Sequence, residues 1–281
     1  MRKGATGKRE MTKSKWWCII RVMLLTVMTY GLMLGFAIVG YVLSFQFPEE
    51  YKDALLEVFG NLGLLLAVLI VCTMVKNRTG VRVRDAIKLR RFNFMLVIML
   101  TLAGWSLGET CDHVMGVLLS NFMSIEPDVN DIGSIWTIIS AVICAPILEE
   151  LIFRFGFMGL LRENFGKIFT IIFSTIIFAI VHTYNIQNTT NVIMGTMLAA
   201  YVYYRTGNIL YTMCEHFLHN ALCCIPLGEM SILGSDVYYE KNGFITSGTP
   251  WLIINLIVLV ISMTWLIWFF RKKGEQDGIT V

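Results

Sequence analysis

Eight long apolar runs, separated by short charged or polar segments, account for most of this chain. A run of about 20 apolar residues is long enough to cross the hydrocarbon core of a bilayer as a helix. With 56% hydrophobic residues and a mean hydropathy of +0.66, the 281 residues are more apolar than a soluble domain. The runs also lack the apolar–polar alternation of membrane barrel strands. They fall at about 18–47, 54–75, 94–123, 135–161, 168–182, 192–204, 209–226 and 251–270.

This pattern predicts an all-α fold, a polytopic transmembrane helical bundle of about eight transmembrane helices in a lipid membrane. The seven cysteines lie in or beside apolar runs and form no CxxC pair, so we interpret them as structural thiols. We divide the chain into a basic N-terminus (1–17), N-terminal helices (18–133) with a basic loop (76–91), a core with charged motifs (134–227), and an outer loop, last helix and basic tail (228–281).

Basic residues gather in the segments that an eight-helix count places on one side of the membrane. These segments are 1–17, 76–91, Arg162, Lys167, Arg205 and 271–273, whereas the loops 124–131 and 228–250 are acidic. Because cytoplasmic loops carry an excess of lysine and arginine, we predict a multi-pass protein, of the cell membrane, with both termini in the cytoplasm. The 76–91 segment is either an interfacial helix on anionic lipid or, as we favour, a plain cytoplasmic loop. We expect no nucleic-acid partner.

The fourth run contains two carboxylates and a guanidinium, at Glu149, Glu150 and Arg154. Each costs about 2.5 kcal/mol or more inside a membrane helix, so such groups are expected to be paired or functional. Glu150 and Arg154 are four residues apart on a helix and can pair. Glu149 points about 100° away around the helix and has no local partner. A desolvated carboxylate of this kind can act as a general base toward water.

Histidines in later runs supply candidate partners. Glu149 and His182 lie at similar distances on either side of the turn near 164–165, so an antiparallel hairpin places them level with each other. His216 and Asn220 are four residues apart and share one helix face. His216 is only about 12 Å past its own turn, so it is level with the others only if the preceding hairpin projects further toward the cytoplasm.

A carboxylate, two imidazoles and an amide that converge in a membrane cavity suit hydrolysis of an amide bond. Glu149 and one imidazole would activate a water molecule, and the other imidazole with Asn220 would stabilise the oxyanion. This mechanism requires no cofactor. Alternatively, Glu149, His182 and His216 could hold a zinc ion with water in the open position, although the common His-Glu-x-x-His zinc motif is absent from the sequence.

The ordered motifs resemble those of the CAAX protease and bacteriocin-processing family of intramembrane proteases, also called Abi. Its pattern is Glu-Glu-x-x-x-Arg, then Phe-x-x-x-His, then His-x-x-x-Asn, on consecutive membrane helices. Here the three motifs run from Glu149 to Arg154, from Phe178 to His182, and from His216 to Asn220, and the turn at 206–209 is also similar to the family.

The resemblance implies a membrane-embedded endopeptidase that acts on a peptide or lipidated peptide, with bacteriocin self-immunity or maturation of peptide signals as bacterial roles. It implies that Glu149 and His182 act on the water and that His216 and Asn220 stabilise the oxyanion. It also implies that Glu150 and Arg154 orient and hold the site. Members are often labelled metalloproteases, and a metal-free glutamate mechanism has also been argued. We expect the site to open toward the cytoplasm.

Other interpretations stay open at this point. The chain could be a non-catalytic scaffold or immunity protein that binds a sensor kinase or a toxin, or, less simply, a transporter with a proton path. We interpret His219 as a helix-bridging or outer-shell residue, and Phe153 and Phe178 as packing residues. For the charged group in the third run, an interfacial or packing role is the default. That group is Glu109, Asp112 and His113.

Overall fold

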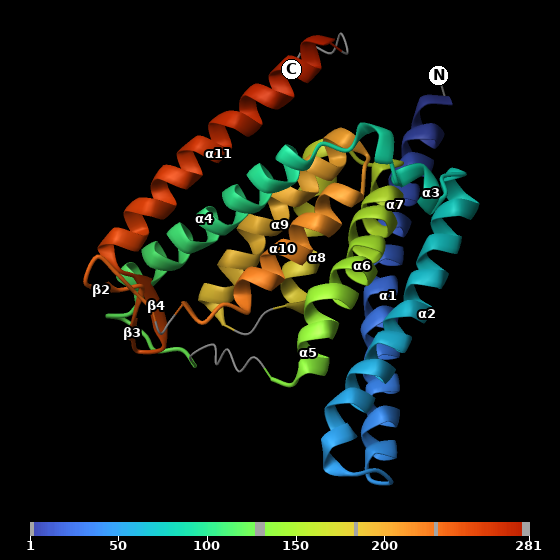
Figure 1. Ribbon diagram of the computed structural model, residues 1–281. Helices are drawn as coiled ribbons and strands as arrows, with labels where there is room; N and C mark the ends of the chain where they lie inside the picture. The colour runs from blue at the N-terminus through green and yellow to red at the C-terminus, as the bar shows by residue number, and fades with distance from the viewer. Residues whose placement is uncertain (1–2, 127–132, 183–184, 228–229, 277–281) are drawn as a thin grey trace.

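The computed structural model describes residues 3–126, 133–182, 185–227 and 230–276, with the helical backbone alone for 3–14 and 273–276. The described chain is helical almost throughout, as predicted, and the two chain ends lie on the same face (Figure 1). The acidic residues Asp128, Asp131 and Glu229, which entered the topology prediction, lie outside the described residues.

Among the described residues, five helical stretches are long and apolar enough to cross a membrane, which makes this a multi-pass protein. They are Lys15–Ser44 in α1 (Lys3–Ser44), Glu49–Thr79 in η1 (Glu49–Tyr51) and α2 (Lys52–Thr79), α4 (Phe94–Leu119), Ile135–Arg162, and Thr249–Lys272 in α11 (Thr249–Gln276). The other three predicted runs correspond to α8 (Lys167–Val181), α9 (Ile186–Thr206) and α10 (Leu210–Cys223), which are shorter or more polar. The count of eight spans therefore stays a prediction.

The polar stretch 185–191, which we placed between two spans, is mostly the beginning of α9. The side chain of Asn185 caps this helix by accepting a hydrogen bond from the backbone N–H of Asn188 at 2.9 Å, so the helix starts before its apolar part. At its other end, α9 stops at Gly207, whose positive φ of 57° is the left-handed conformation that a C-terminal glycine favours.

The fourth run is not a uniform α-helix. It consists of α5 (Ile135–Ile139), a π-helix η3 (Ser140–Cys144), α6 (Ala145–Glu150), a second π-helix η4 (Leu151–Met158) and α7 (Gly159–Arg162). Pro146 follows η3 and has no N–H to give to a preceding carbonyl, which interrupts the backbone ladder there. Gly156 of η4 lies against Val71 of α2, where a side chain would leave no space for that valine. The run is therefore adapted locally to its neighbours.

The helices form two packed groups (Figure 1). One core joins α1, α2, η4, α8 and the end of α9, with the fully buried Phe153 and Phe157 at its centre. The other joins α4, α9, α10 and α11 around Leu96, Leu100 and Leu266. The candidate site lies where the two groups meet, because α6 belongs to the first and α10 contacts both.

The basic segment 76–91 is held on the turn between α9 and α10 and contains the short helices α3 (Val83–Ala86) and η2 (Leu89–Arg91). The Nζ of Lys88 donates to the carbonyl of Thr206 at 2.9 Å, and the hydroxyl of Tyr211 donates to the carbonyl of Arg91 at 2.6 Å. These contacts dock the segment on the α9–α10 turn, and its placement as a cytoplasmic loop stays a prediction.

Two small antiparallel hairpins occupy the predicted outer loop, β1 (Ser231–Ile232) with β2 (Ser235–Asp236) and β3 (Tyr238–Lys241) with β4 (Phe244–Ser247). The buried Glu109 of α4 accepts hydrogen bonds from the Tyr238 hydroxyl at 2.8 Å and the Trp251 indole at 2.9 Å. Burial and this carboxylate raise the pKa of the Tyr238 phenol above its usual range. Asp112 accepts from the Asn191 amide at 2.6 Å. These contacts agree with the packing role expected for both acidic residues.

Candidate active site

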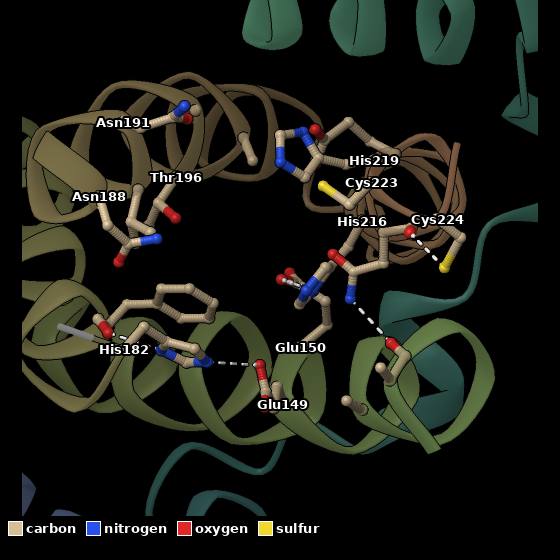
Figure 2. Close-up of a pocket in the computed structure, with 18 of the residues that line it drawn as sticks. Glu149, Glu150, His182, Asn188, Asn191, Thr196, His216, His219, Cys223 and Cys224 are labelled. Atoms are coloured by element: carbon tan, nitrogen blue, oxygen red, sulfur yellow. Dashed lines mark hydrogen bonds and ion pairs between the residues drawn. The ribbon is translucent and has the colours of Figure 1, made fainter. Parts of the chain in front are cut away.

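The three charged motifs meet in the interior of the bundle. Glu149 and Glu150 are the last residues of α6, His182 ends α8, and His216 and Asn220 lie on α10 (Figure 2). All of them line one cavity of about 580 Å³. Segments that are far apart in the sequence therefore contribute to one polar site.

Glu149 and His182 face each other as their positions in the hairpin predicted. The carboxylate Oε2 of Glu149 lies 3.3 Å from Nε2 of His182. The Nδ1 of His182 is 2.8 Å from the carbonyl of Phe178, which can only accept, so Nδ1 carries the proton and donates it there. In a neutral imidazole, Nε2 is then an acceptor. Glu149 Oε2 is buried and has no hydrogen-bond partner among the described residues. While the imidazole is neutral, two acceptors therefore adjoin each other, which suits a molecule that can donate to both.

Glu150 is enclosed by two cationic or potentially cationic partners. Its Oε2 lies 3.4 Å from Nε of Arg154 and its Oε1 lies 3.4 Å from Nδ1 of His216. Both members of the glutamate–arginine pair are almost completely buried, with exposures of 1% and 2%. A buried charge of this kind needs a counter-charge, so Arg154 holds Glu150 ionised and Glu150 in turn orients His216.

Phe178, which we expected to be a packing residue, also positions His182. Its ring stacks on the imidazole of His182, with centroids 4.1 Å apart and planes 11° apart. The guanidinium of Arg154 lies 5.1 Å from the same ring centroid, and Phe153 meets the ring edge-on at 4.9 Å. Together with its carbonyl, Phe178 therefore fixes the position of His182. Phe153 acts as a packing residue, as we expected.

Asn220 is partly engaged by the backbone of the fourth run. Its Nδ2 donates to the carbonyl of Ala141 in η3 at 2.8 Å. In a π-helix the carbonyl of one residue accepts a hydrogen bond from the backbone N–H of the fifth residue after it. For Ala141 this residue is Pro146, which has no backbone N–H. The amide of Asn220 replaces the missing donor. It retains a second N–H for a ligand.

The π-helices also explain how His216 and Glu150 come to lie at the same depth, although they are at different distances from their own turns in the sequence. A π-turn closes on the fifth residue and not on the fourth, so η4 holds more residues for its length than an α-helix. Glu150 is therefore closer to the α7–α8 turn than a 1.5 Å rise per residue implies. This brings it level with His216, which lies nearer to its own turn in the sequence.

The cavity extends away from the chain termini. Beyond the motif residues, its walls come from the first turn of α5, the first turns of α9 and the last turn of α10. All three lie on the side of the β-hairpins, opposite the N- and C-termini (Figure 1). A second cavity of about 610 Å³ continues in that direction along β3 and β4. The two cavities share Asn188, Asn191, Val192, His219 and Cys223.

Sequence reasoning missed several residues of this cavity. Glu215 precedes His216 on α10, is 6% exposed and lines the cavity, yet we assigned it no role. Asn188 and Thr196 of α9 face His182 and Glu149 across the cavity (Figure 2). The signal for Glu215 was its charge inside an apolar run. The polar residues of α9 carried no such signal. His219 lies beside Trp105, with ring centroids 5.5 Å apart, and also lines the cavity.

The donor set does not form a metal site in this arrangement. No group of three histidine, cysteine, aspartate or glutamate side chains in the described chain is placed to hold a metal ion. His182 is directed to Glu149, whereas Nδ1 of His216 is directed to Glu150.

Comparison with protein families supports the resemblance. Residues 131–222 match the family model described as type II CAAX prenyl endopeptidase Rce1-like. The matched segment covers about a third of the chain and contains all three motifs. No curated protein and no solved structure gave a significant match.

Proposed function

We propose that this chain is an intramembrane endopeptidase of the CAAX protease type and that it hydrolyses a peptide bond with a water molecule activated by Glu149 and His182. The observation that carries this proposal is the separation of 3.3 Å between Glu149 Oε2 and His182 Nε2 on the wall of the cavity, both of which accept hydrogen bonds when the imidazole is neutral. A water molecule there donates one hydrogen to each, and its oxygen lone pair is directed at a substrate carbonyl.

In the first step, the water oxygen bonds to the carbonyl carbon while Glu149 takes one water proton. The carbonyl oxygen becomes an oxyanion. His216 in its protonated form, with Nδ1–H on Glu150, donates from Nε2 to this oxygen, and the second N–H of Asn220 does the same. In the second step, the C–N bond breaks and the proton on Glu149 passes to the leaving amine. Arg154 balances the charge of Glu150 throughout and does not exchange a proton.

The substrate is a membrane-associated peptide or protein, since the cavity lies among membrane helices. A prenylated peptide fits the name of the matched family, and maturation of a bacteriocin or peptide signal fits the resemblance read from the motifs. The same cavity would admit an extended, unlipidated segment.

We also propose that both termini lie in the cytoplasm. All but three of the 23 lysines and arginines fall in 1–21, 76–91, 162–167, 205 and 271–273, on the side of the termini. The exceptions are Lys52, Lys241 and Arg154. Because the cavity extends to the opposite side, this orientation directs it toward the outer face. It is incompatible with the cytoplasmic opening that we expected from the sequence.

The test uses the purified full-length protein with a library of quenched fluorescent peptides. We expect cleavage by the wild type, loss of cleavage in Glu149→Gln and His182→Ala, and unchanged cleavage in Glu163→Gln, an exposed carboxylate of the same hairpin. Metal content measured on the same samples tests the zinc alternative. Equal cleavage by wild type and Glu149→Gln would refute the assignment of the base. Absence of cleavage, with a partner protein retained by both site variants, would support the scaffold interpretation.

A further inference from the structure

Glu215 is the one carboxylate of the catalytic cavity to which the mechanism above gives no role. Its exposed fraction is 6%, and it lies on the cavity wall. In the described part of the chain, no hydrogen-bond donor contacts its side chain, whereas Glu149 faces His182 and Glu150 faces Arg154. A carboxylate kept at this depth without a donor is expected to meet one from a ligand.

Glycines leave room around this carboxylate. A Cβ placed on Gly104 of α4 would lie 3.5 Å from Oε1 of Glu215 and 3.9 Å from Gly195 of α9. A Cβ placed on Gly195 itself would meet nothing within 4 Å, and Gly195 lines the same cavity. Gly104 of α4 therefore lets its helix approach Glu215 closely, whereas Gly195 leaves open space in the cavity that Glu215 also lines.

Apart from His216, whose Nδ1 is directed to Glu150, the surrounding charge favours a cation. Arg154 is the one lysine or arginine among the described residues that line the two connected cavities, and it is paired with Glu150. Acidic side chains continue into the second cavity, together with the aromatic rings of Trp105, Tyr238 and Tyr239, which also attract cations. These acidic residues are Glu109, Asp112 and Glu240.

We propose that Glu215 binds a lysine or arginine side chain of the substrate, close to the bond that is cleaved. This inference rests on the proposed peptidase function and adds the substrate class. A basic side chain would enter along the acidic walls of the second cavity and form a charge-assisted hydrogen bond with the Glu215 carboxylate. Glu215 is then a specificity residue, and the hydrolytic step itself stays with Glu149 and His182.

The experiment moves a single lysine along a neutral fluorogenic peptide and replaces it in a matched set by norleucine, which has a similar length and no charge. For the preferred position, wild type should cleave the lysine peptide with a kcat/KM about 10- to 100-fold above that of the norleucine peptide. Glu215→Gln should remove this preference by lowering cleavage of the lysine peptide, with the norleucine peptide within about twofold of wild type. Glu163→Gln should behave as wild type.

Binding measured on Glu149→Gln keeps this proposal separate from the peptidase proposal. In that background the lysine peptide should bind more tightly than the norleucine peptide, and the added Glu215→Gln change should abolish the difference. A preference that survives Glu215→Gln, or an equal loss for both peptides, would overturn the specificity role. If Glu149→Gln cleaves as wild type does, the peptidase mechanism fails, whatever the lysine preference.

Discussion

Replacing Glu150 by Gln should destabilise the protein more than any exposed charge change, because it strands Arg154 as an unpaired charge. The two side chains are 1% and 2% exposed, and the closest approach of their charged atoms is 3.4 Å. Removing one partner of such a pair costs about 3–5 kcal/mol. For a chain of this size, each kcal/mol corresponds to about 2–4 °C in Tm, so we expect a decrease of about 6–20 °C.

The assay is a thermal melt of the detergent-purified variants at one fixed scan rate, since unfolding of large proteins is commonly irreversible. The matched double change Glu150→Gln with Arg154→Met removes both charges and should recover most of the loss. Glu49→Gln, which breaks an exposed pair with Lys52, should leave Tm unchanged within error. A decrease below about 2 °C for Glu150→Gln, or a double variant as unstable as the single one, would refute the buried-pair argument.

Cleavage separates the structural role of this pair from its chemical role. His216 loses its carboxylate partner in every variant that lacks Glu150. Peptide hydrolysis should therefore stay low in the double variant even where its Tm is restored. Recovery of cleavage together with Tm would mean that Glu150 acts on stability alone.

Three further outcomes are expected. Asn220→Leu should lower stability by about 1–3 kcal/mol by leaving the carbonyl of Ala141 without a donor, and adding Pro146→Ala should recover part of it through the restored N–H, as thermal melts can measure. Chelator treatment should leave hydrolysis unchanged, whereas loss of activity that returns with zinc would contradict the metal-free mechanism. In a cysteine-free background, an impermeant maleimide should label Leu233→Cys in intact cells and Leu89→Cys only after permeabilisation; the reverse pattern would invert the proposed topology.

Much of the site could be predicted because helix geometry relates sequence spacing directly to space. Glu150 and Arg154 pair across one turn, and Glu149 meets His182 across the hairpin. Charged side chains are costly inside a membrane helix, so the sequence also indicates which residues need partners. The all-α class followed from the lengths of the apolar runs.

What could not be predicted depends on tertiary contacts. The fourth run has the composition of an ordinary helix, so its two π-helices could not be predicted from periodicity. Pro146, which lacks an N–H, follows the first, and Gly156 of the second lies against Val71. Both hairpins at 231–247 are short, and the β3–β4 hairpin is held by Glu109 of α4, which is far away in the sequence, so no local pattern predicts it. Glu215 was overlooked because its proposed role depends on a cavity that distant segments of the chain form together, and not on its own neighbours in sequence.

The two adjacent glutamates illustrate how position alone can divide chemical roles. Glu150 is enclosed by Arg154 and His216, and its charge is used to hold and orient those groups. Glu149 is one residue earlier, lines the cavity and lies 3.3 Å from Nε2 of His182. A carboxylate that is saturated by cations is a poor proton acceptor, whereas one that lacks donors readily accepts from water. The helix thus separates an anchoring carboxylate from a reactive one by a rotation of about 100°. Exchanging the two functions would require a second arginine on the face of Glu149, and among the described residues that line the cavity there is none.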